Sequence, residues 1–198
     1  MRTIILATAV GFTFLASPAA AQDLKQSWTY CANENQQYSN DTAISGCTAI
    51  IESGKETNSN LAIAYYDRGV FYAREQDDSR AIADYDRSIA LNPQASAYFN
   101  RGNAYKRAKD YDRAITEYER ALQLNPKHIK AYVNRGWSYL EKGEYKSAIA
   151  SFDEALQLDP NHATALYDRG IALDRLGRTA EGAADIAKAK QIDPRVAD

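Results

Sequence analysis

Residues 98–126 read YFNRGNAYKRAKDYDRAITEYERALQLNP, a stretch that contains two helix patterns and a stop signal. In its first half, aromatic and small residues recur at spacings of four and three, which places them on one helix face; they are Tyr98, Gly102 and Tyr105. A second helix face follows the polar segment RAKDYD and comprises Ala114, Tyr118 and Ala121. Asn125 precedes a proline and is therefore pushed out of helical geometry. The stretch predicts a helix hairpin that closes tightly at Gly102 and Ala114, with tyrosines filling the space on either side.

The ending of this stretch occurs four times in the chain, as SIALNP at 88–93, ALQLNP at 121–126, ALQLDP at 155–160 and AKQIDP at 189–194. The four prolines are 33, 34 and 34 residues apart, and a glycine stands 24 residues before each of them. A fixed period of this length is typical of a repeat array. One hairpin cannot bury its apolar face alone, whereas stacked copies bury a continuous core.

The repeat resembles the tetratricopeptide repeat family, whose pattern is W-x2-L-G-x2-Y, then A-x3-F, then P, within 34 residues. The third copy matches this pattern with Tyr132, Gly136, Tyr139, Ala148, Phe152, Ala155 and Pro160. The resemblance covers about 62–196 and implies an all-α, right-handed superhelical solenoid of antiparallel helix hairpins. We assign the repeats to 62–94, 95–128, 129–162 and 163–196, and a degenerate hairpin with its linker to 22–61.

The chain departs from the family pattern at the residue before each repeat glycine. That position holds arginine instead of leucine in all four copies, at Arg68, Arg101, Arg135 and Arg169. We expect each arginine to lay its stem on the helix surface and to keep its charged end in water or paired. The possible partners are acidic residues on the second helices: Asp84, Glu117 and Asp185.

The degenerate N-terminal unit contains the only two cysteines. Its segment DTAISGCTAI at 41–50 aligns with DRAITEYERA at 112–121, so Cys47 takes the place of Tyr118. Counting back, Cys31 takes the place of a repeat glycine. These two positions face each other in the other copies, and an even cysteine count in an exported protein favours a disulfide. We therefore predict a Cys31–Cys47 disulfide.

The first 21 residues carry the marks of a secretory signal peptide. Arg2 is followed by an apolar run without charge, and the small residues Ala19–Ala21 precede Gln22. The alternative is a membrane anchor, but the run is shorter than the ~20 residues that cross a bilayer. We expect cleavage after 1–21, a periplasmic or secreted protein, and no membrane insertion after cleavage.

Charge and motifs favour a protein that is not an enzyme. Lys and Arg number 24 against 26 Asp and Glu, so no basic excess suggests a nucleic-acid partner. The two histidines, His128 and His162, occupy the same repeat position after the proline turn, where a cap or loop role is favoured over a metal or catalytic one. We find no catalytic constellation, and we expect neither cofactor nor metal.

The resemblance also implies where a protein or peptide would bind. In this family the first helix of each repeat lines the concave surface, and the exposed positions lie close to the repeat glycine. The predicted partner-binding residues are Tyr66, Asp67, Phe99, Asn100, Asn103, Lys130, Asn134, Trp137 and Asp168. Side-chain amides can donate to and accept from a peptide backbone. Two alternatives stay open: asparagine is simply common at such positions, and Trp137 packs between repeats.

A family clamp for a C-terminal carboxylate is matched only in part. Lys130, Asn134 and Asn100 take clamp-like places, but Tyr66 and Val70 stand where the clamp has Lys and Asn. We therefore do not predict the binding of chaperone tails. The sequence favours a non-enzymatic interaction scaffold that binds an extended peptide or partner protein in its groove. The alternative is an accessory subunit of an envelope enzyme or of a polysaccharide-export assembly.

Overall fold

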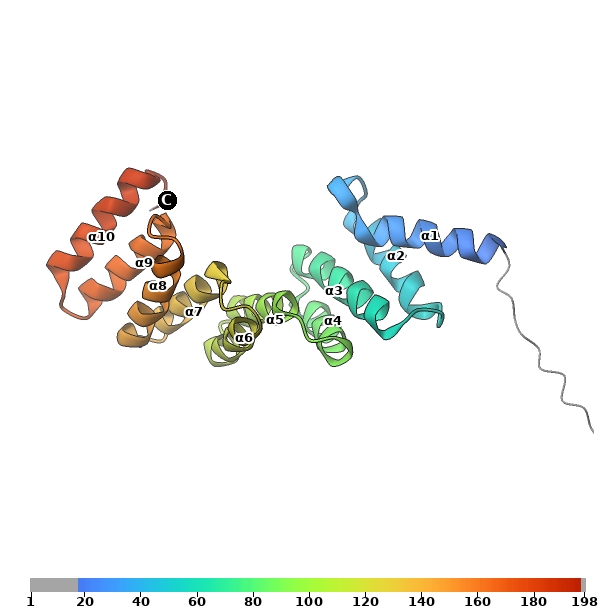
Figure 1. Cartoon of the computed structure of the whole chain (residues 1–198), viewed down its shortest axis with the longest axis horizontal. Helices are drawn as coiled ribbons and strands as arrows, with labels where there is room; N and C mark the ends of the chain where they lie inside the picture. Colours follow the sequence, from blue (N-terminus) through green and yellow to red (C-terminus); the bar gives the residue numbers. More distant parts are fainter. Residues whose placement is uncertain (1–17, 197–198) are drawn as a thin grey trace, which may run out of the picture.

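The computed structural model describes residues 18–196, and within this range it consists of α-helices and one short 3₁₀ helix without any strand (Figure 1). The elements are α1 (Pro18–Ala32), η1 (Glu34–Gln36), α2 (Asn40–Glu52), α3 (Asn58–Arg74), α4 (Asp78–Leu91), α5 (Ala95–Arg107), α6 (Tyr111–Leu124), α7 (Ile129–Glu141), α8 (Tyr145–Leu158), α9 (Ala163–Arg175) and α10 (Thr179–Ile192). The predicted signal peptide lies largely outside the described residues, and its expected cleavage point falls within α1.

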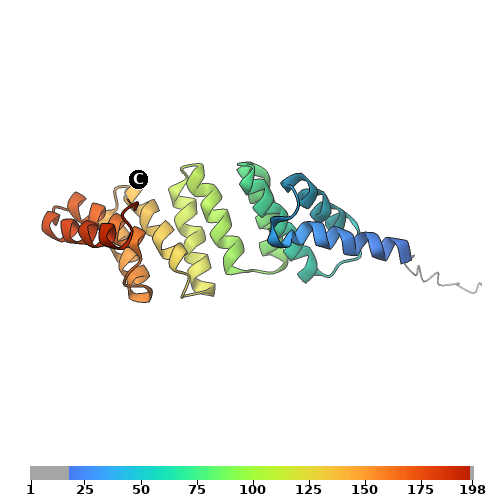
Figure 2. The same cartoon turned by 90° about the horizontal axis from the view of Figure 1, so that it is seen from above.

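The helices pair into five hairpins that follow one another along the long axis of the molecule, as both views show (Figure 2). Within a hairpin the two helices pack closely, and the second helix then packs on the first helix of the next hairpin. First helices also contact one another, in the pairs α1–α3, α3–α5, α5–α7 and α7–α9, whereas within residues 18–196 no such row of contacts joins the second helices. Successive hairpins thus approach each other more closely on the side of their first helices, which curves the stack. The first helices therefore line the concave face.

Each complete hairpin closes where the repeat glycine meets a large side chain on the second helix. A Cβ atom added to Gly102 would lie 2.8 Å from Tyr118 Cε1, and one added to Gly136 would lie 2.7 Å from Phe152 Cε1. Both ring residues are fully buried. The close approach predicted from the small residues is therefore confirmed, since any side chain at the glycine would displace the ring.

The tyrosines divide between core and surface. Tyr72, Tyr85 and Tyr118 are buried, which agrees with the predicted packing role. Tyr98 and Tyr105 are only half-buried and lie under guanidinium groups, with Arg101 5.5 Å from the centre of the Tyr98 ring and Arg113 4.4 Å from that of Tyr105. The expectation that Tyr105 fills the core beside Tyr118 is therefore wrong, because its ring covers the hairpin from outside.

The arginine beside each repeat glycine reaches across its own hairpin. Arg68 donates two hydrogen bonds of 2.8 Å to the carboxylate of Asp84, and Arg169 pairs with Asp185 in the same way. Arg101 pairs with Glu117. The three predicted acidic partners are confirmed. All three also bind the preceding hairpin, Arg68 through the Thr48 hydroxyl, Arg101 through Asp86 and Arg169 through Asp153.

Arg135 differs from the other three arginines. Its Nε donates to the hydroxyl of Ser151 at 3.1 Å, and among the described residues it forms no ion pair. The hairpin of α7 and α8 thus carries a neutral partner where the other complete hairpins carry a carboxylate.

The two histidines cap helices. His128 Nδ1 accepts a hydrogen bond from the Ala131 N–H at 3.3 Å, and His162 Nδ1 accepts one from the Ala165 N–H at 3.2 Å. Each imidazole thus satisfies one of the unpaired N–H groups at the start of a helix. The predicted cap role is confirmed.

The N-terminal hairpin is closed by the disulfide between Cys31 on α1 and Cys47 on α2. Both residues are fully buried, and their Cα atoms are 4.6 Å apart. Gly46 lets the helices approach, because a Cβ atom there would lie 2.6 Å from Tyr30 Cβ. Trp28 fastens α1 to the linker before α3 through its indole N–H, which donates to Glu56 at 2.9 Å.

Candidate functional site: the concave face

The predicted partner-binding residues all lie on first helices, from α3 to α9. Lys130 is exposed, and the other eight are partly buried. α3 supplies Tyr66 and Asp67, α5 supplies Phe99, Asn100 and Asn103, α7 supplies Lys130, Asn134 and Trp137, and α9 supplies Asp168. The contacts between successive first helices bring these short segments into one continuous surface.

The amide side chains on this surface form hydrogen bonds across hairpins. Asn100 Nδ2 donates to the Tyr66 hydroxyl at 3.0 Å, and Asn134 Nδ2 donates to Asn103 Oδ1 at 2.8 Å. Asn103 Oδ1 also accepts from the Tyr118 hydroxyl at 2.9 Å. The sequence pattern placed these amides on one face but did not reveal that they reach each other, because that depends on the spacing of neighbouring first helices. Asn100 keeps its Oδ1 as an available acceptor.

Lys106 is a central residue of this face that the sequence analysis missed. Its Nζ donates to Asn134 Oδ1 at 3.4 Å and lies 5.1 Å from the centre of the Trp137 ring. Burial lowers the pKa of Lys106, with neighbouring Arg107 acting in the same direction. Lys106 follows the repeat glycine Gly102 by four residues, one helical turn further along the same face, and that spacing was the available signal.

A cavity of about 200 Å³ opens between α3 and α5 on this face. Its lining joins two arginines at the ends of these helices to amide, aromatic and apolar side chains: Val70, Ala73, Arg74, Tyr85, Asn100, Asn103 and Arg107. Arg107 is paired with Asp78, with Nε 2.9 Å from Oδ1. Arg74 forms no ion pair among the described residues and lies 5.2 Å from the Phe71 ring centre.

Two half-buried carboxylates flank this central region. Burial raises the pKa of Asp67 to about 6 and that of Asp168 to about 6. For Asp168 the charge of Lys106 acts in the opposite direction but does not cancel the effect of burial. Both carboxylates are thus less well solvated than ordinary surface aspartates, and a donor or cation from a partner would stabilise their ionised forms.

The aromatic residues of this face also take part in packing. Trp137 lies edge-on to Tyr111 of the preceding hairpin, with ring centres 5.8 Å apart. Phe99 lies 4.6 Å from the His128 ring and 5.9 Å from the Tyr118 ring. Val133, which precedes Asn134 on α7, is buried. Trp137 therefore contributes to the junction between hairpins.

Between residues 18 and 196 no group of three or more His, Cys, Asp or Glu side chains is arranged to hold a metal ion. In the same part of the chain, no helix has both the length and the apolar character needed to cross a membrane.

Comparison with known structures finds MamA proteins with the same fold. A crystal structure of MamA superposes with a TM-score of 0.77 at 20% identity, covering 88% of this chain and 94% of that chain. The MamA RS-1 ArsTM double mutant gives a TM-score of 0.78 at 20% identity, covering 87% and 95%. None of the curated proteins matches the chain in sequence. At this identity the likeness establishes the solenoid fold.

Family models give the assignment. Three models described as tetratricopeptide repeat match residues 62–94, 93–161 and 133–197. Together they span 62–197, the part of the chain built from the four complete hairpins. The repeat glycine packed against a large side chain, the proline after each second helix and the row of first helices agree with these matches. The chain therefore belongs to the tetratricopeptide repeat family.

Proposed function

We propose that the chain is an exported, non-enzymatic binding module that holds an extended segment of a partner protein against its concave face. Support for a protein partner comes from membership of a family of interaction scaffolds and from a continuous polar surface along four stacked hairpins. Export is inferred from the N-terminal sequence and fits the disulfide, which persists in oxidising compartments.

The observation that carries the proposal is the cross-hairpin row of amides with Lys106 at its centre. Tyr66, Asn100, Asn103, Asn134 and Lys106 belong to three successive hairpins and are fixed by their mutual hydrogen bonds. Side chains held in place this way lose little freedom when a ligand binds, which favours affinity.

The chemistry of the row suits an extended backbone. Asn100 Oδ1 can accept from a peptide N–H, and the ammonium of Lys106 can donate to a peptide carbonyl or carboxylate. Neighbouring helices stack ~8–10 Å apart, and an extended peptide advances ~3.3 Å per residue, so one hairpin corresponds to about three peptide residues. At the two ends of the row, the half-buried carboxylates of Asp67 and Asp168 would accept hydrogen bonds from N–H groups of the peptide.

A displayed library of random peptides, selected on the chain after removal of 1–21, tests the proposal. Affinity of the selected peptides would be measured for the wild type and for Asn100→Ala/Lys106→Ala. We expect this pair to weaken binding about tenfold or more, because it removes one acceptor and one charged donor.

The matched control is Lys146→Ala/Glu154→Ala, which changes one cation and one anion exposed on α8. It should leave peptide affinity within about twofold. If selection yields no peptide, or if the selected peptides bind both double variants equally, the concave face is not the binding surface.

A further inference from the structure

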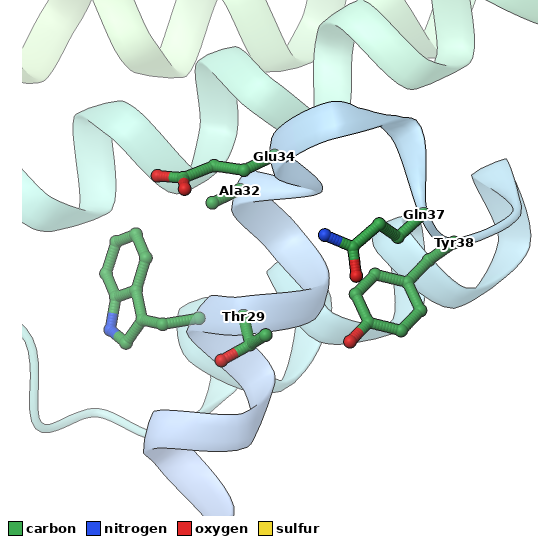
Figure 3. Close-up of a pocket in the computed structure, with 6 residues that line it drawn as sticks. Thr29, Ala32, Glu34, Gln37 and Tyr38 are labelled. Atoms are coloured by element: carbon green, nitrogen blue, oxygen red, sulfur yellow. The ribbon is translucent and has the colours of Figure 1, made fainter.

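A second cavity lies in the N-terminal hairpin. It is separate from the row of hydrogen-bonded side chains on the concave face. It has a volume of about 290 Å³ and is formed by α1, η1 and the segment that leads into α2. Its lining combines two aromatic side chains with polar groups: Trp28, Thr29, Ala32, Glu34, Gln37 and Tyr38. In Figure 3 the side chains of Gln37 and Tyr38 lie to the right of α1, and the carboxylate of Glu34 points to its left. This volume is near the lower limit for small-molecule sites, ~300 Å³.

The loop that forms one wall is held in an unusual backbone conformation. Asn33, Asn35 and Gln36 all have positive φ angles, of 41°, 61° and 55°. Residues other than glycine adopt such angles at a cost of ~1–3 kcal/mol each, and they concentrate at ligand sites. None of these three positions is glycine, so side-chain contacts must maintain the conformation.

Those contacts come from a buried amide. Asn33 is 6% exposed, and its side chain donates to the Tyr38 carbonyl at 3.0 Å and accepts from the Tyr38 N–H at 2.9 Å. The disulfide at Cys31 fixes the chain just before the loop, and Ser39 caps α2 just after it. Tyr38 and Glu34 are thus presented from a rigid frame, as a preformed binding site requires.

The charges around the cavity indicate the ligand. Glu34 is the only charged residue in the lining, and among the described residues it forms no ion pair. The indole N–H of Trp28 is already bonded to Glu56, so the indole offers its ring to a ligand and no further donor. Faces of Trp and Tyr rings carry negative electrostatic potential and attract cations, as in sites that recognise choline.

We propose that this cavity binds a small organic cation, an alkylammonium head group that contacts the ring of Trp28 with its charge near the Glu34 carboxylate. Thr29 and Gln37 supply hydroxyl and amide groups for a polar substituent on the ligand. The site is separate from the concave row and does not depend on the proposed peptide binding.

The fluorescence of Trp28 can report ligand binding, because this residue lines the cavity. The chain has two tryptophans, so Trp137→Phe leaves Trp28 as the only one. Fluorescence of this variant, with its disulfide intact, would be titrated with choline and with 3,3-dimethylbutanol, which has the same shape without the charge. We expect saturable binding of choline and about five- to thirtyfold weaker binding of the neutral analogue.

Glu34→Gln in the same background should weaken choline binding about fivefold or more and leave the affinity of 3,3-dimethylbutanol unchanged. Glu52→Gln, which removes an exposed charge on α2, is the matched control for net charge and should have no effect. Circular dichroism and non-reducing mass measurement would verify that each variant keeps its helices and disulfide.

Vesicles of phosphatidylcholine distinguish the source of the cation. Co-sedimentation with them would assign the site to a lipid head group, and binding of choline without co-sedimentation would assign it to a soluble amine. The proposal is overturned if choline gives no saturable response, if choline and its neutral analogue bind equally, or if Glu34→Gln leaves choline affinity unchanged.

Discussion

Cys31 and Cys47 occupy the same two facing positions in the N-terminal hairpin that a glycine and a large side chain occupy in the complete hairpins. They are 16 residues apart, as are Gly102 and Tyr118. In three of the complete hairpins a buried ring packs against the glycine, and in the hairpin of α9 and α10 Ile186 does so. In the N-terminal hairpin a covalent bond replaces that contact. This hairpin has no large core side chain at the equivalent position, and the disulfide joins its two helices instead.

Removing the disulfide should therefore destabilise the N-terminal hairpin. For a loop of about 15 residues, chain-entropy arguments give ~3 kcal/mol. We expect Cys31→Ala/Cys47→Ala to open this hairpin before the rest of the solenoid, as measured by hydrogen exchange across α1 and α2. Cys31→Gly/Cys47→Tyr, which rebuilds the contact of the complete hairpins, should recover part of the loss. Unchanged exchange in the alanine variant would contradict the stapling role.

Gly136→Ala should destabilise the hairpin of α7 and α8, although the same change in an exposed helix stabilises by ~1 kcal/mol. The new Cβ atom would lie 2.7 Å from Phe152 Cε1, and overpacking of this kind costs ~1–3 kcal/mol. Adding Phe152→Leu should relieve the clash, so the double variant should lose less than the sum of the two single losses. Urea unfolding measures all three, and a more stable Gly136→Ala would show that the helices can separate freely.

Arg68 and Arg135 occupy equivalent positions but should differ in their effect on stability. The carboxylate partner of Arg68, Asp84, is only 5% exposed, whereas Arg135 binds the neutral Ser151. Arg68→Met leaves a buried charge unpaired and should cost about 3 kcal/mol, whereas Arg135→Met should cost under about 1 kcal/mol. Thermal melts compare the two. Arg68→Met/Asp84→Ala should be more stable than Arg68→Met alone, and equal losses for the two arginines would contradict this account.

Asp67 should make the protein less stable as pH rises. Its pKa is raised by burial from an unfolded value near 4 to about 6, so between these values the folded state holds the extra proton. The contribution of Asp67 to the free energy of unfolding is fully present below pH 4 and is lost as the pH rises through 6. Asp67→Asn should therefore raise the free energy of unfolding by about 1–2 kcal/mol at pH 7.5 and have no effect below pH 4. A stabilisation that is equal at both pH values would exclude ionisation as the cause.

Trp137→Ala should lower the melting temperature by several degrees, because the indole packs on Tyr111 and under Lys106 at the junction of two hairpins. Lys146→Ala on the exposed side of α8 provides the comparison and should not change it. If Trp137→Ala has the same melting temperature as the wild type, the indole does not stabilise the junction, and partner binding is then its only proposed role.

The repeat period, the glycine and the proline of each copy are local features, and they determined the all-helical class and the order of hairpins by themselves. The pairing of Arg68 with Asp84 could also be anticipated, because a fixed separation of 16 residues places the same two positions face to face in every hairpin. The facing of Cys31 and Cys47 follows from the same register. Predictions of this kind succeed where both partners lie within one hairpin.

Contacts between hairpins were decided only by the tertiary structure. The bond from Asn134 to Asn103, the position of Lys106 over Trp137 and the carboxylate of Asp86 bound to Arg101 all depend on how far one hairpin is rotated and shifted against the next. The cavity beside Trp28 depends on a loop whose positive φ angles are imposed by the Asn33 side chain, in a sequence without glycine at those positions. Sequence periodicity fixes which helix face a residue occupies, whereas the distances between faces come from the packing of all the side chains between them.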